Sequence, residues 1–250
     1  MQKINRILIG IVTYSGKEYC LDDFIISLTE IIADCVNNNI DFGVRFFDNS
    51  DGYDYSNKIR GRGFDVTKCG KFDDPRENIC NSYNALRNYF LDHDYTHLLT
   101  LEQDVMPPKD VINKLLKQDK SVIGAWYHIG AGKHLRPVVC VGKSISITTN
   151  ERSQYNIPNE VKTKFKFDFI DSEELNDPCI MQVYSMGLGC VLMTREILEK
   201  IKFTVRKNHD GSFSGFNDSQ FYCDLHYLKI PVFIDTSLFC THRSEDLRIY

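Results

Sequence analysis

Short apolar runs alternate with amphipathic segments along the first half of the chain. Residues 7–12 are rich in isoleucine and lead into Thr-Tyr-Ser-Gly, which predicts a buried strand running into a loop. Apolar residues then recur at helical spacing over 21–35, and residues 43–47 predict a second strand that ends at Asp48. The order strand, helix, strand predicts a parallel sheet with right-handed crossovers.

The same alternation continues beyond a long polar stretch. Residues 49–74 are rich in Gly, Asp, Asn and Tyr, and we interpret them as mostly loop. A helix is predicted from Pro75, a favourable first-turn residue. Strands are predicted at 95–101 and 121–126, with a helix opened by Pro107-Pro108 between them.

The second half of the chain is less regular. Strands are predicted near 187–193 and 232–234, with helices after Thr194 and around 221–228. Two stretches without a clear period, 127–136 and 150–180, are interpreted as irregular polar loops of the kind that carry specificity. We find neither an internal repeat nor a linker composition, which favours one domain.

Composition narrows the function classes. The chain has 250 residues, 42% of them hydrophobic, and can therefore bury a large core. With 30 basic and 34 acidic residues it lacks the basic excess of a general polyanion binder, so no nucleic-acid partner is expected. The nine cysteines form no C-x-x-C pair, and no apolar stretch reaches the ~18 residues of a membrane span. These features predict a cytoplasmic protein with reduced thiols.

Acidic residues follow two of the predicted strands. Asp48 ends the second strand, and Glu102 and Asp104 end the third. Ligands of open α/β sheets bind beyond the carboxyl ends of the strands. Carboxylates two residues apart at a strand end point the same way and suit Mg²⁺ or Mn²⁺ holding a diphosphate. A solvated loop is the alternative, since E-x-D is common by chance.

Several motifs, taken in order, resemble GT-A fold glycosyltransferases of the broad family-2-like group. Residues 98–107 (LLTLEQDVMP) are similar to the D-x-D segment of that family. Further matching segments are 9–14 (IGIVTY), 46–50 (FFDNS), 76–78 (REN), 185–195 (SMGLGCVLMTR), 217–221 (NDSQF), 229–235 (KIPVFID) and 241–242 (TH). The resemblance covers about 7–126 and 185–243.

This resemblance implies an α/β fold with a single GT-A-like (Rossmann-like) domain over 1–250, whose mixed central sheet is flanked by helices. About 1–126 would bind the nucleotide sugar and about 127–250 the acceptor. The implied enzyme is a metal-dependent, hexosyltransferase-like glycosyltransferase. It would move a sugar, with inversion, from a nucleoside-diphosphate sugar (a UDP-sugar or GDP-sugar) to a hydroxyl of a glycan, protein or small-molecule acceptor.

The resemblance also implies roles for individual residues. Those expected to contact the donor are Thr13, Tyr14 and Asp48 at the base and ribose, Arg76 at the diphosphate, and Glu102 at the ribose or a metal-bound water.

The metal and the catalytic base fall on other matching positions. Asp104 and His242 are expected to hold Mn²⁺ or Mg²⁺, and Asp218 to act as general base. Two positions depart from the family pattern: Glu102 stands where Asp is commoner, and the acidic pair is Asn217-Asp218. Simpler readings are a surface histidine for His242 and a helix N-cap for Asp218.

Two other functions stay open on the residues. One is a non-catalytic nucleotide-sugar or glycan binding protein on the same fold, because a fold does not guarantee chemistry. The other is a nucleotidyltransferase, which should carry a basic Gly-rich phosphate loop; residues 12–16 contain no basic residue.

Overall fold

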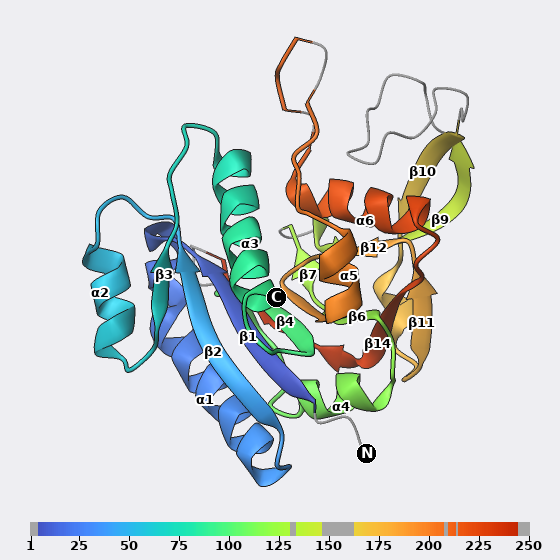
Figure 1. Ribbon diagram of the computed structural model, residues 1–250. Coiled ribbons are helices and arrows are strands. Elements are labelled where there is room, and N and C mark those ends of the chain that lie inside the picture. The colour runs from blue at the N-terminus through green and yellow to red at the C-terminus, as the bar shows by residue number, and fades with distance from the viewer. Residues whose placement is uncertain (1–4, 131–133, 147–162, 208–209, 214, 245–250) are drawn as a thin grey trace.

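A mixed eight-stranded sheet forms the centre of the molecule (Figure 1). The computed structural model describes residues 5–130, 134–146, 163–207, 210–213 and 215–244. In spatial order the strands are β11 (Ile180–Val183), β14 (Val232–Phe239), β6 (Val122–Trp126), β13 (Cys190–Thr194), β4 (His97–Glu102), β1 (Arg6–Thr13), β2 (Asp41–Asp48) and β3 (Val66–Lys68).

Helices and small sheets surround this sheet. The helices are α1 (Leu21–Asn37), α2 (Asp54–Gly61), α3 (Pro75–Leu91), α4 (Val111–Lys117), α5 (Arg195–Lys200) and α6 (Asn217–Tyr227), with 3₁₀ helices η1 (Ser15–Cys20) and η3 (Ser172–Leu175). The small sheets are β10 (Thr163–Phe169) with β9 (Val139–Ser146) and β12 (Ser185–Met186), β15 (Thr241–His242) with β5 (Val105–Met106), and β7 (His128–Ile129) with β8 (Arg136–Pro137). The predicted α/β class, with a mixed sheet flanked by helices, is confirmed. Its division into two functional halves stays a prediction.

The pattern of β1 explains why helices cover both faces of the sheet. Its alternate side chains point to opposite faces, as in any strand. Leu8 and Val12 pack in the core that contains α3, whereas Ile7, Ile9 and Ile11 pack in the core that contains α1. Figure 1 shows these two helices on opposite sides of β1 and β2. Gly10 permits the close approach of α3, because a Cβ there would lie 2.2 Å from Leu86 Cδ1.

The interpretation of residues 49–74 as mostly loop is wrong in part. They contain α2 and β3. The helix buries only Tyr55 and Ile59 as apolar side chains, and β3 adds a three-residue edge pairing to β2. Elements this short lack enough turns to show a period. The 127–136 stretch holds β7 and β8, while 131–133 and 147–162 lie outside the described residues.

Strand register brings the acidic strand ends to one edge. Thr13 at the end of β1 lies level with Asp48 on β2, and Val12 lies level with Glu102 on β4. β1 is parallel to both neighbours, so the three carboxyl ends meet there. Among the described residues, no helix is long and apolar enough to cross a membrane.

Candidate active site

A cavity of about 850 Å³ opens at this carboxyl edge. Its volume lies within the range of small-molecule sites. It is lined by the ends of β1 and β4, the loops after β1, β2 and β3, the first turns of α3 and the residue before α6. These residues are Val12, Thr13, Tyr14, Ser15, Lys17, Asn49, Ser50, Asp51, Lys71, Phe72, Asp73, Pro75, Asn78, Ile79, Glu102 and Phe216. Three aromatic rings in this lining, those of Tyr14, Phe72 and Phe216, are between 44% and 52% exposed. The cavity thus combines exposed rings with charged groups.

At the inner side of the cavity, a lysine lies between the two carboxylates of the E-x-D segment. The Nζ atom of Lys17, in η1, lies 2.6 Å from Asp104 Oδ1 and 3.6 Å from Glu102 Oε2. Burial alone would lower the pKa of Lys17, but the two carboxylates outweigh it and raise that pKa. Lys17 therefore stays charged. We call Lys17, Glu102 and Asp104 the open cluster, because Lys17 and Glu102 line the cavity.

The two carboxylates of the open cluster differ in their surroundings. Burial raises the pKa of Glu102, and the nearby charges of Asp104 and Asp218 add to this, whereas Lys17 and Tyr83 oppose it. Tyr83 donates a hydrogen bond to Glu102 Oε1 at 3.1 Å. Burial also favours the neutral form of Asp104, but Lys17 and His242 outweigh burial and lower the pKa of Asp104 to about 2.

The structure brings His242 to Asp104. His242 lies opposite Val105 where β15 pairs with β5, and its Nε2 atom is 3.5 Å from Asp104 Oδ2. Its Nδ1 atom is buried without a hydrogen-bond partner among the described residues. The His242 side chain is 19% exposed, so it is partly buried against Asp104 rather than fully at the surface. Whether this pair holds a metal stays a prediction.

Gln103, the middle residue of E-x-D, was not among the expected site residues. It is fully buried, and its Nε2 donates to the backbone carbonyl of Lys17 at 2.6 Å. Its Oε1 accepts from the hydroxyls of Thr13 and Tyr55. Gln103 thus ties the loop after β1 to the end of β4. An amide inside an acidic strand-end motif is a weak sequence signal for such a tie.

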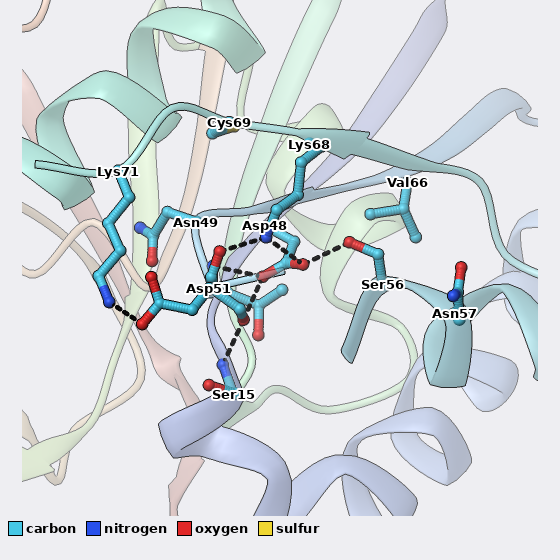
Figure 2. Close-up of polar contacts among 12 residues, drawn as sticks. Ser15, Asp48, Asn49, Asp51, Ser56, Asn57, Val66, Lys68, Cys69 and Lys71 are labelled. Atoms are coloured by element: carbon cyan, nitrogen blue, oxygen red, sulfur yellow. Dashed lines mark hydrogen bonds and ion pairs between the residues drawn. The ribbon is translucent and has the colours of Figure 1, made fainter. Parts of the chain in front are cut away.

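Asp48, expected at the base and ribose, is wholly buried beside the cavity. Its carboxylate accepts hydrogen bonds from Ser56 and from the backbone of Ser50, and it pairs with Lys68 at 3.2 Å. Figure 2 shows Ser56 and Lys68 pointing at it. We call these four residues the closed cluster. The cluster places the Asn49–Asp51 loop at the cavity wall, where Lys71 pairs with Asp51 (Figure 2).

The other expected donor contacts fall in different places. Thr13 and Tyr14 both line the cavity, but Thr13 is 1% exposed whereas Tyr14 is 45% exposed. Arg76 is not among the lining residues: its guanidinium pairs with Asp74 at 3.0 Å and donates to the Phe213 carbonyl at 2.8 Å.

Asp218 lies in the first turn of α6 and is not the N-cap, which is Phe216. The N-cap alternative is therefore wrong. Burial raises the pKa of the Asp218 carboxyl, although hydrogen bonds from Ser219 oppose this. The charge of Asp218 contributes to the raised pKa of Glu102. The neighbouring Asn217 is 2% exposed and turned inward.

Comparisons with known proteins support the fold. Neither a family model nor a curated protein matches the chain. Residues 1–349 of TarS from S. aureus match with a TM-score of 0.52 and 11% identity, over 94% of this chain and 60% of that one. A197 from STIV matches with a TM-score of 0.45 and 15% identity, over 98% and 92% of the two chains. The catalytic domain of Drosophila beta1,4galactosyltransferase 7 matches with a TM-score of 0.44 and 10% identity, over 93% and 65%.

The fold is therefore GT-A-like, as the sequence motifs predicted, and TarS shares it. At 11% identity the TarS likeness shows the shared fold alone. Any activity of this chain has to be argued from its own site.

Proposed function

We propose that the protein is a glycosyltransferase that uses a nucleoside-diphosphate sugar, a UDP-sugar or a GDP-sugar. The observation that carries this proposal is the cavity at the carboxyl edge, where the open cluster meets exposed aromatic rings. A ring such as Tyr14 or Phe72 can stack on a base, and Lys17 can attract a diphosphate. The acceptor is a hydroxyl of a glycan, protein or small molecule.

We assign the general base to Asp218. The acceptor hydroxyl gives its proton to this carboxylate while its oxygen bonds to the anomeric carbon. The bond from that carbon to the diphosphate oxygen breaks, and its electron pair stays on the diphosphate. Attack opposite the leaving group inverts the anomeric carbon. Burial raises the pKa of Asp218, which makes it a better base than an exposed aspartate.

The metal expected at Asp104 and His242 fits this arrangement poorly. A buried ammonium already lies 2.6 Å from Asp104 and 3.6 Å from Glu102. A divalent ion between these carboxylates would meet the like charge of Lys17. No group of three or more His, Cys, Asp or Glu side chains in the described part of the chain could hold a metal. Mn²⁺ or Mg²⁺ binding stays a prediction, and no step above depends on it.

A thermal-shift screen of nucleoside-diphosphate sugars, followed by assays of sugar transfer and donor hydrolysis, tests the proposed function. We expect one UDP- or GDP-sugar to raise the melting temperature, since a ligand that binds only the folded state stabilises it. The same donor should lose its sugar slowly to water. Absence of a shift with every donor, with and without Mn²⁺, would overturn the proposal. Binding without any turnover, across an acceptor panel, would favour the non-catalytic alternative.

A nucleotidyltransferase is a second candidate because of one observation. Lys17 immediately follows residues 12–16 and lines the cavity, so the loop after β1 does carry a basic group. Such an enzyme would join a nucleoside triphosphate to a sugar phosphate and release pyrophosphate. Pyrophosphate release from a nucleoside triphosphate and a sugar 1-phosphate, without transfer from any nucleotide sugar, would favour this candidate.

A further inference from the structure

The position of Lys17 suggests a role beyond an ordinary ion pair. Its side chain is 17% exposed, faces two carboxylates and lines the cavity. An ammonium has three N–H donors. One donates to Asp104 Oδ1 at 2.6 Å, while Glu102 Oε2, at 3.6 Å, lies beyond hydrogen-bond distance. A donor therefore remains for a phosphate oxygen in the cavity. Lys71, the other cation among the described lining residues, is 47% exposed and paired with Asp51. Lys17 is therefore the less solvated of the two.

The backbone of Lys17 is held in place from several sides. Its N–H donates to the Tyr14 carbonyl at 2.9 Å, and its carbonyl accepts from Gln103 Nε2 at 2.6 Å and from Cys20 Sγ at 3.2 Å. Asp104 then restrains the far end of the side chain. A cation ordered before the ligand arrives loses little conformational freedom on binding. The loop after β1 thus presents a preorganised positive charge.

We propose that Lys17 is a built-in cation that binds the diphosphate of the donor and stabilises the charge left on it, in place of a divalent metal ion. The inference rests on the proposed function. The leaving diphosphate gains negative charge when the anomeric bond breaks, and a preorganised positive group nearby stabilises it. Glu102 and Asp104 hold the ammonium, whereas the sequence pattern predicted that these two carboxylates contact a metal ion or its waters.

Calorimetric titration of UDP and GDP into the protein, in EDTA and in Mn²⁺, tests this inference without relying on turnover. We expect wild-type affinity in EDTA to lie within about threefold of that in Mn²⁺. Lys17→Met keeps the apolar stem and removes the charge. It should weaken binding in EDTA by about 10- to 100-fold, the range for one hydrogen bond to a charged group. Mn²⁺ should restore part of that loss, because the two carboxylates are then free to bind it.

Two matched variants serve as controls. Lys17→Arg keeps the charge and should bind in EDTA within about tenfold of wild type. Lys58→Met removes a lysine that pairs with Glu18, the residue after Lys17 in η1. Lys58 does not line the cavity, so this variant should bind the nucleotide as wild type does. Melting temperatures show whether each variant is folded.

Several outcomes would overturn the inference. A wild-type protein that binds UDP or GDP only with Mn²⁺ contradicts it while leaving the proposed function intact. So does a folded Lys17→Met variant that binds in EDTA as wild type does. A wild-type protein that binds neither nucleotide in either buffer overturns the proposed function as well. If Lys17→Met does not fold, the comparison of wild-type affinity in EDTA and in Mn²⁺ still tests the inference.

Discussion

The ends of β2 and β4, on either side of β1, carry the same kinds of residue in different settings. At the end of β2, the closed cluster pairs Asp48 with Lys68, and the carboxylate is 0% exposed. At the end of β4, the open cluster pairs Asp104 and Glu102 with Lys17, and two of these side chains line the cavity. The difference shows that a strand-end acid can either face the cavity or hold the wall behind it. Access to the cavity, rather than residue type, separates the two.

The largest expected effect concerns Asp218, the proposed general base. Asp218→Asn keeps the size of the side chain and removes its basicity, so turnover should fall by about 10²–10⁴. Donor binding, measured by calorimetry, should stay near wild type. Turnover within a factor of about two of wild type would contradict the role of base. A product that keeps the donor's anomeric configuration, read by NMR, would contradict inversion independently.

The next effect tests whether the closed cluster is structural. Asp48→Asn leaves the Lys68 ammonium without its carboxylate and should lower the free energy of unfolding by about 3 kcal/mol, measured by urea denaturation. Asp51→Asn is the matched control: that carboxylate is 80% exposed, so its loss should cost less than about 1 kcal/mol. An Asp48→Asn variant of wild-type stability that loses nucleotide affinity would instead support the ribose contact predicted from sequence.

Acid pH should weaken the open cluster in a defined direction. Lys17 and His242 hold the pKa of Asp104 at about 2, below the value of 3.8 for an unperturbed aspartate. A carboxylate with a lowered pKa stabilises the fold above its unfolded pKa, and this contribution disappears as the pH falls towards 2. We expect Asp104→Asn to cost about 2 kcal/mol near neutral pH and progressively less below about pH 4. Urea midpoints of both proteins across that range measure the difference, and a pH-independent difference would contradict it.

The smallest effect concerns the tie that Gln103 makes between the end of β1 and the end of β4. Thr13→Val removes one of two hydroxyl donors to Gln103 Oε1, while Tyr55 still donates at 2.6 Å. Stability should fall by about 1 kcal/mol, the typical contribution of one hydrogen bond. Nucleotide affinity should change by less than about threefold. A loss of binding free energy that exceeds the loss of unfolding free energy would support a direct contact between Thr13 and the nucleotide.

Local patterns were sufficient for the long elements. The isoleucines of β1 and the helical spacing of α1 and α3 predicted three elements of the core, because each buries one continuous face. Pro75 predicted the start of α3, where Asp74 accepts a hydrogen bond from the Arg76 backbone. Strand ends at Asp48 and Glu102 followed from the same patterns.

Contacts between distant segments were beyond such patterns. Lys17 and Asp104 are 87 residues apart in sequence, and Gln103 and Lys17 are 86 apart. A lysine after a strand carries no local signal of these contacts, and a glutamine inside E-x-D carries only a weak one. The family resemblance placed Asp104, His242 and Asp218 in one region, but could not show that an ammonium sits among the carboxylates.

The sequence by itself determined the alternation of long strands and helices, and with it the strand ends where acidic residues gather, because the period of a segment and its place along the chain are local properties. Only the tertiary structure decided which acids face the cavity. Asp48 is closed off by Ser56 and Lys68, whereas Glu102 stays accessible beside Lys17. Burial and charge pairing depend on segments that meet only when the sheet assembles, so the chemistry of each carboxylate is a property of the fold.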